Sequence, residues 1–176
     1  MRSCRVWVRV VLGCLLLALC CVQQLAQAAS LPVFPTKGLA SNKALAVPPR
    51  SGWLFLAIGL HPRTQPLLET ALSQVQPLRK QHPELQMAEI AVVDKGMFPD
   101  NGITRAFMRS QVKNKTLMPL IYASFTDLRA LQTKLGLSAK QELVLVLVDA
   151  AGEIQFSSTQ QRLDAESLKR LSAALE

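Results

Sequence analysis

Three almost unbroken apolar runs limit what this chain can fold into. They are residues 53–60 (WLFLAIGL), 85–94 (LQMAEIAVVD) and 142–148 (ELVLVLV). The lack of polar alternation is typical of strands that are covered on both faces of a sheet. The last run is followed by Asp149-Ala150-Ala151-Gly152 and then by residues 153–157. Because Asp and Gly suit a tight turn, we expect an antiparallel hairpin there.

Segments with helical spacing separate these runs. Side chains that end in a hydroxyl, a carboxamide or a carboxylate can cap the first turn of a helix. We therefore expect helices that begin near Thr64, at Asp100 or Asn101, after Thr126 and after Asp164. A further strand is expected over residues 117–123. The resulting order is strand, helix, strand, helix, strand, helix, hairpin, helix. Such alternation predicts an α/β fold with helices on both faces of one sheet.

The N-terminus has the features of an export signal. Arg2, Arg5 and Arg9 precede the apolar residues 10–22, and Ala26-Gln27-Ala28 supplies a cleavage site. This pattern predicts a signal peptide over residues 1–28 and a periplasmic or secreted protein.

Two alternatives remain for this segment. Residues 6–22 are nearly long enough to cross a bilayer, so an uncleaved N-terminal segment could anchor the protein in the membrane. Residues 11–13 before Cys14 resemble a lipobox, so a lipid-modified cysteine is the other alternative.

Cleavage after Ala28 would leave one domain without a thiol. All four cysteines, Cys4, Cys14, Cys20 and Cys21, lie within the predicted signal, and its removal lowers the net charge from +8 to +5. Residues 29–50 are rich in Pro, Ser, Gly and Lys and predict a lead-in loop or weak hairpin, while residues 51–176 form the predicted domain. A chain of this size buries enough surface to fold without disulfides or metals.

Three of these segments resemble the thioredoxin-like superfamily, in particular its redoxin or peroxiredoxin-like branch. They are residues 54–59 with the following helix, residues 119–124, and residues 143–154 with their strand, Asp-x-x-Gly turn and strand. The resemblance spans most of residues 31–176. It implies a three-layer sandwich with a central mixed sheet, a C-terminal β-hairpin and a terminal helix. A narrower similarity is to the family of the mitochondrial ATP synthase assembly factor, whose members often lack the redox cysteine pair.

The chain departs from the redox members of this superfamily at their reactive site. Where those relatives place Cys-x-x-Cys or the peroxidatic cysteine, this chain has His61-Pro62-Arg63-Thr64. The proline that precedes the hairpin in thioredoxins is also missing, because Gln141 and Glu142 occupy that region. Thiolate attack and disulfide exchange both need a sulfur nucleophile. We therefore predict no catalytic residue of the family type and no cofactor.

The residues at the first predicted strand end form a candidate binding site. His61, Arg63 and Thr64 lie where ligands bind in open α/β sheets, next to a helix start whose free N–H groups favour anions. The alternative is a turn that is merely polar.

A second candidate is a basic interaction face. Arg105, Arg109 and Lys113 recur every four residues and would form one stripe on a helix. Such a stripe could contact an anionic membrane surface or an acidic partner, and the alternative is a solvated helix face. We do not expect nucleic acid as a partner, because the chain is predicted to be exported and has few aromatic side chains for base stacking.

A metal site is not expected. His61 and His82 are the only histidines, and no His-x-x-x-His or cysteine pair accompanies them. A Ser-His-Asp triad is compatible with the composition, but no Gly-x-Ser-x-Gly motif supports one.

Together these patterns predict an exported, non-catalytic thioredoxin-fold protein that binds a protein or peptide of the cell envelope as a binding or assembly module. Two alternatives remain open. One is an envelope enzyme of non-thiol mechanism, hydrolase-like, that uses His61 as a base. The other is a degenerate peroxiredoxin-like oxidoreductase.

Overall fold

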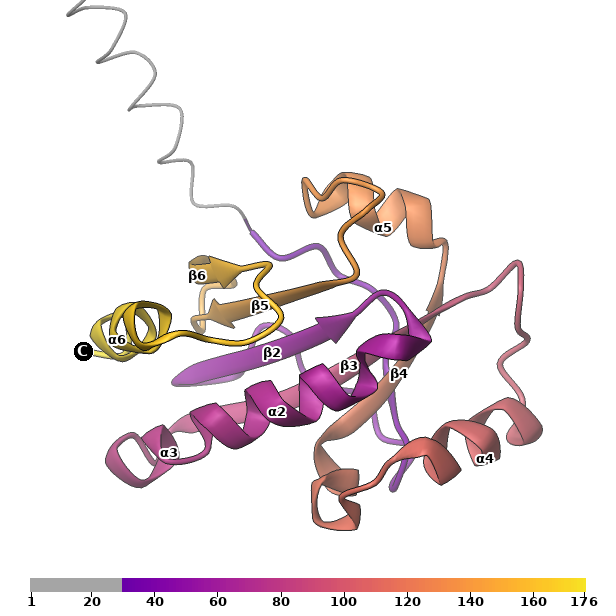
Figure 1. Ribbon diagram of the computed structural model, residues 1–176, viewed down its shortest axis with the longest axis horizontal. Helices are drawn as coiled ribbons and strands as arrows, with labels where there is room; N and C mark the ends of the chain where they lie inside the picture. The colour runs from indigo at the N-terminus through magenta and orange to yellow at the C-terminus, as the bar shows by residue number, and fades with distance from the viewer. Residues whose placement is uncertain (1–29) are drawn as a thin grey trace, which may run out of the picture.

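A computed structural model describes residues 30–176, which form a mixed sheet of six strands (Figure 1). In their order across the sheet, the strands are β1 (Lys37–Gly38), β4 (Ile121–Thr126), β3 (Leu85–Asp94), β2 (Trp53–Gly59), β5 (Leu143–Val148) and β6 (Ile154–Ser158). Strands β2, β3 and β4 are parallel, whereas β1, β5 and β6 each run antiparallel to the strand that they join. The predicted hairpin of β5 and β6 is confirmed.

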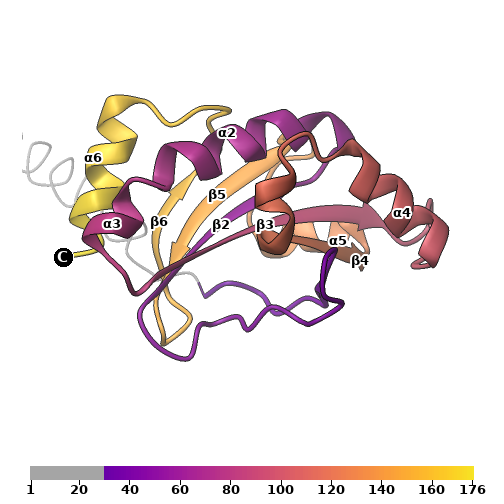
Figure 2. The ribbon, with the colours of Figure 1, turned by 90° about the horizontal axis from the view of Figure 1, so that it is seen from below.

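Helices and loops cover both faces of this sheet. The helices are α2 (Gln65–Val75), α3 (Leu78–Gln81), α4 (Gly102–Gln111), α5 (Leu128–Lys134) and α6 (Ala165–Ala173), with 3₁₀ segments η1 (Pro62–Thr64) and η2 (Lys115–Leu120). Helices α2, α3, α4 and α6 lie along one face, and the segment before β2 runs across the other (Figure 2). The predicted order of strands and helices is confirmed, and so is the α/β class.

Strand β2 lies at the centre of two apolar clusters. Phe55 and Ala57 pack with α2 and α6, whereas Leu54, Leu56 and Ile58 pack with α5 and the segment that precedes β2. Successive side chains of a strand point to opposite faces, so a strand between two covered faces needs apolar residues at every position. This explains why the run from Trp53 shows no alternation.

Asparagine and aspartate side chains cap three of the helices. Asn101 accepts a hydrogen bond from the Thr104 N–H, Asp127 from the Ala130 N–H and Asp164 from the Ser167 N–H. Asp127 rather than Thr126 therefore caps α5. Thr64 precedes α2 but makes no capping hydrogen bond, because its hydroxyl donates to the His61 carbonyl instead. The predicted caps at Thr64 and Thr126 are thus wrong.

The strand expected over residues 117–123 begins later. Residues 115–120 form η2, and β4 pairs with β3 from Ile121 opposite Glu89 to Thr126 opposite Asp94. Pro119 lacks the N–H that a central strand must donate to its neighbour, which accounts for the delayed start.

The lead-in segment makes only short strand contacts. Within it, Lys37 and Gly38 pair with β4, the Gly38 N–H donates to the Lys43 carbonyl at 2.8 Å, and Ser30 forms an isolated bridge to Glu153. The predicted signal peptide and all four cysteines lie outside the described residues. Within residues 30–176, every helix is too short or too polar to cross a bilayer.

Gly59, the last residue of β2, allows α2 to approach the sheet. A Cβ atom at this position would lie 2.5 Å from the Thr64 Oγ1 and 2.6 Å from the Leu68 Cδ1. We expect Gly59→Ala to lower the free energy of unfolding by roughly 1–3 kcal/mol through overpacking, measured by urea denaturation.

Gly102→Ala is the matched control for this substitution. A Cβ at Gly102 meets no atom within 4 Å, and Ala is a better helix former than Gly, so the control protein should be at least as stable as the wild type. Equal stability of the two variants would contradict the close approach of α2.

Candidate functional site

The turn after β2 satisfies most of its own polar groups. The Thr64 hydroxyl donates to the His61 carbonyl at 2.6 Å, and the Thr64 N–H donates to the same carbonyl at 3.0 Å. The Arg63 N–H donates to His61 Nδ1 at 3.1 Å. These bonds fix the turn and use N–H groups that an anion would otherwise contact.

Only part of the predicted anion site is therefore open to a ligand. Thr64 is buried and serves the turn, whereas Arg63 is exposed and His61 is half-buried. Because His61 Nδ1 accepts from the backbone, Nε2 is the ring nitrogen left for an outside partner. The structure thus leaves two side chains, His61 and Arg63, at the carboxyl end of β2.

A buried carboxyl group lies beneath the start of α2. Glu89, in the middle of β3, is aligned with Ala57 of β2 and Ile121 of β4, and its side chain is fully buried. Neither of its carboxyl oxygens has a hydrogen-bond partner among the described residues. Burial of an ionised carboxylate without a partner is costly, so the group favours its neutral form.

Burial sets the charge state of this acid, and two polar side chains of α2 modify it. Burial raises the pKa of Glu89 to about 8; the nearby Gln65 amide opposes this rise, and the negative charge of Glu69 adds to it. The Gln65 amide is itself directed to Glu69, donating from Nε2 to Oε1 at 3.4 Å. Glu89 is therefore mostly protonated at neutral pH.

Glu69 also connects α2 to the segment after α4. Its carboxylate accepts hydrogen bonds from the Lys113 N–H at 3.2 Å and from the Asn114 N–H at 3.4 Å. A shallow groove follows this junction on the surface, lined by Pro66, Glu69, Thr70, Ser73, Gln74, Lys113 and Asn114. The groove begins three residues after Arg63, and six of its seven lining residues are of polar type.

The basic stripe predicted on α4 does not form as one exposed face. Arg105 is buried: its Nε donates to Asp100 Oδ1 at 2.6 Å and its guanidinium lies 5.2 Å from the centre of the Phe125 ring. Arg109 and Lys113 are exposed, although Arg109 Nη1 also reaches the Leu39 carbonyl at 3.4 Å. Arg105 therefore anchors the helix, and it is not available to a partner.

The described part of the chain holds no cluster of three or more histidine, cysteine or acidic side chains close enough to bind a metal. His82 lies before the start of β3, at the opposite edge of the sheet from His61, and its Nδ1 is 3.6 Å from Glu84. The two histidines thus do not share a site.

Glu89 is the site residue that the sequence analysis missed. Its signal is a single acid in the middle of the apolar run LQMAEIAVVD. In a strand with one solvated face, such an acid would point to water. In the structure, β3 lies between β2 and β4 and under α2, so the positions in the middle of the run are buried. An acidic side chain is unusual at such a position.

The buried acid makes stability depend on pH. Glu89 ionises near 4.5 when unfolded and near 8 when folded, so between these values the folded protein holds the extra proton and stability falls as pH rises. We expect a loss of several kcal/mol across this window, at about 1.4 kcal/mol per unit of pKa, measured by urea denaturation at a series of pH values.

In Glu89→Gln, this loss should disappear, because the amide cannot ionise. Glu142→Gln, at an exposed position, should keep the wild-type pH profile and serves as the matched control. Parallel profiles of the wild type and Glu89→Gln would contradict the assignment.

Solved structures of low identity share this architecture. A putative electron transfer protein from Aquifex aeolicus VF5 matches with a TM-score of 0.55 at 13% identity, over 84% of this chain and 93% of its own. Yeast Sco1 matches with a TM-score of 0.55 at 9% identity, over 84% and 95%. The exposed lipoprotein thioredoxin Etrx1 from Streptococcus pneumoniae matches with a TM-score of 0.53 at 8% identity, over 80% and 97%.

No protein-family model matches the chain, and no curated protein sequence is significantly similar to it. At such identities the structural matches establish the fold alone. The fold is the one that the sequence resemblance implied. The chain has a thioredoxin-like fold, an α/β architecture in which helices flank a mixed sheet of six strands.

Proposed function

We propose that this protein is an exported, non-catalytic binding or assembly module of the cell envelope. The observation that carries the proposal is the turn after β2, where redox relatives of this fold place a reactive cysteine and this chain has His61-Pro62-Arg63-Thr64. Residues 30–176 contain no cysteine at all. The fold is present, and the sulfur nucleophile that its usual chemistry needs is not.

The internal hydrogen bonds of the turn support a structural rather than a reactive role. A nucleophile needs a base within reach and an orienting group behind that base. Here His61 Nδ1 accepts from its own backbone and the Thr64 hydroxyl is buried and donates to a carbonyl. Neither group is arranged to activate the other.

The surface next to this turn suits an extended peptide. The groove along α2 presents the Thr70 and Ser73 hydroxyls and the Glu69 carboxylate from one helix face, with Lys113 on its side. Arg63 precedes its first lining residue, Pro66, by three positions in the sequence. Residues 30–176 carry 17 basic and 12 acidic side chains, which favours a partner with acidic groups. We therefore propose a protein or peptide segment with acidic side chains as the ligand.

Thiol-based activity should be absent. Purified residues 29–176 should reduce insulin and consume peroxide no faster than buffer, because neither reaction can begin without a thiolate. An authentic thioredoxin and a peroxiredoxin serve as positive controls. Clear turnover by this protein would overturn the proposal in favour of an oxidoreductase.

Arg63 should contribute to peptide binding. We expect Arg63→Ala to weaken binding of acidic peptides selected on the wild-type protein by about tenfold, as expected for loss of a charge-assisted hydrogen bond, measured by fluorescence anisotropy. Lys169→Ala, an exposed cation on α6, should leave the affinity unchanged. Equal affinities of Arg63→Ala and the wild type would show that Arg63 does not contribute to peptide binding.

Two further experiments address the enzymatic alternative and the location. If a hydrolytic activity is found and His61→Ala abolishes it while the fold is retained, His61 acts as a base and the non-catalytic proposal fails. Export rests on residues 1–28, and mass spectrometry of the protein from its native cells should find a mature N-terminus after Ala28.

A further inference from the structure

Large apolar side chains gather on the exposed surface at one end of the molecule. Met97 and Phe98 lie in the loop after β3, with 75% and 47% of their surface exposed, and Ile103 and Phe107 lie on α4 with 82% and 63% exposed. Among the described residues, only one other large apolar side chain, Val33, is exposed to this degree. We refer to these four residues as the α4 face.

Helix α4 turns two large apolar side chains, Ile103 and Phe107, outward and an arginine inward. Arg105 is buried, Met108 packs beside it, and Val112 lies in the adjoining apolar cluster. Ile103 and Phe107 are four residues apart, so they share the opposite side of the helix. An amphipathic helix on a water-facing surface would be expected to have the reverse arrangement.

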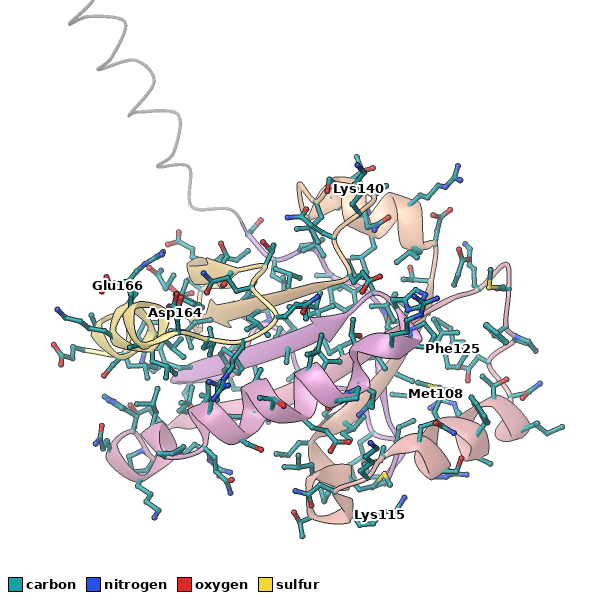
Figure 3. All side chains as sticks on the ribbon, viewed as in Figure 1. Met108, Lys115, Phe125, Lys140, Asp164 and Glu166 are labelled. Atoms are coloured by element: carbon teal, nitrogen blue, oxygen red, sulfur yellow. The ribbon has the colours of Figure 1, made fainter. Side chains whose placement is uncertain are left out.

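Arg105 fixes this orientation. Its Nε donates to Asp100 Oδ1 at 2.6 Å, and its guanidinium lies over the Phe125 ring at 5.2 Å. Figure 3 shows Met108 and Phe125 between α4 and the sheet, and Lys115 beyond the end of the helix. The outward position of Ile103 and Phe107 is therefore built into the packing of α4.

Several exposed basic side chains lie close in sequence to the α4 face. Lys95, Arg109, Lys113 and Lys115 are exposed in the same segment. Of the acids nearby, Asp100 is paired with Arg105 and lies 3.8 Å from Lys37, Asp94 accepts from the Gly96 N–H, and Glu69 accepts from the backbone after α4. Residues 94–115, which contain the α4 face, thus carry five basic and two acidic side chains, a net charge of +3.

We propose that the α4 face docks on the surface of an anionic lipid bilayer. Helices that lie in a membrane interface combine an outward apolar side with flanking lysine and arginine, and their affinity rises with anionic lipid. The α4 face is drawn from α4 and the loop that leads into it, which lie at one edge of the molecule (Figure 1). In the proposed arrangement its apolar side chains enter the acyl boundary and the basic groups meet headgroups. None of the four apolar residues lines the groove along α2, and Lys113 is the basic residue that the two surfaces share.

Vesicle binding tests this proposal directly. Residues 30–176 contain the whole sheet and its apolar clusters, so we would use the purified mature chain, residues 29–176. Sedimentation with vesicles should show binding to phosphatidylcholine mixed with phosphatidylglycerol, and at least tenfold weaker binding to phosphatidylcholine alone. The double variant Ile103→Ser, Phe107→Ser should lose at least tenfold in binding to the anionic vesicles.

Val33→Ser is the matched control, because Val33 is as exposed as Ile103, 83% against 82%, and lies outside the α4 face. It should bind as the wild type does. Phe107→Trp should show a blue-shifted fluorescence on anionic vesicles, and Val33→Trp should not. Circular dichroism establishes that each variant is folded.

Three outcomes would overturn the proposal. They are no binding to either vesicle, full binding by the folded Ile103→Ser, Phe107→Ser protein, and binding without a shift in Phe107→Trp. If the protein does not bind vesicles but binds an acidic protein through Phe107, the α4 face is a protein interface instead.

Discussion

The burial of β2 on both faces is the constraint from which the rest of the structure follows. Alternate residues of this one strand contact the elements that cover the two faces of the sheet. Phe55 and Ala57 face α2 and α6, while Leu54, Leu56 and Ile58 face α5 and the lead-in segment. A parallel neighbour on one side and an antiparallel neighbour on the other supply the backbone hydrogen bonds that a buried strand must make. The close approach of α2 at Gly59 then brings the turn after β2 to the edge of the sheet.

Burial on both faces of the sheet also explains why the pKa of Glu89 is raised. A carboxyl group in the middle of β3 has no route to water, and its neighbour Glu69 is negative and already accepts hydrogen bonds from Gln65 and from the backbone after α4. Protonation is the only remaining way to reduce the cost of burial, since no cation pairs with the acid among the described residues. Glu89 thus lies under α2, the helix that lines the groove. Ionisation of Glu89 would place a second negative charge near Glu69, which binds the segment after α4.

Much of the fold could be predicted from the sequence, because burial on both faces leaves an apolar run that can be recognised without a structure. The run at 85–94 matches β3 to the residue. The site was less predictable. Thr64 and Arg105 have residue types that favour exposed, functional positions, yet both are buried, Thr64 by the approach of α2 and Arg105 by Asp100 and Phe125. These outcomes depend on the local course of the turn at Thr64 and on Phe125 in β4, and periodicity along one helix contains neither.

Parallel strand order also relates the two proposed surfaces. Because β2 and β3 are parallel, the turn at His61 and the loop at Met97 leave the sheet at the same edge (Figure 1). A molecule docked through the α4 face would therefore hold the end of the α2 groove near the lipid surface. A peptide bound there would most simply belong to a partner that is itself at the membrane, such as the segment next to a transmembrane helix. In the proposed arrangement, the positive charge that would attract the protein to anionic lipid would also favour an acidic partner, so one charge distribution would support both contacts.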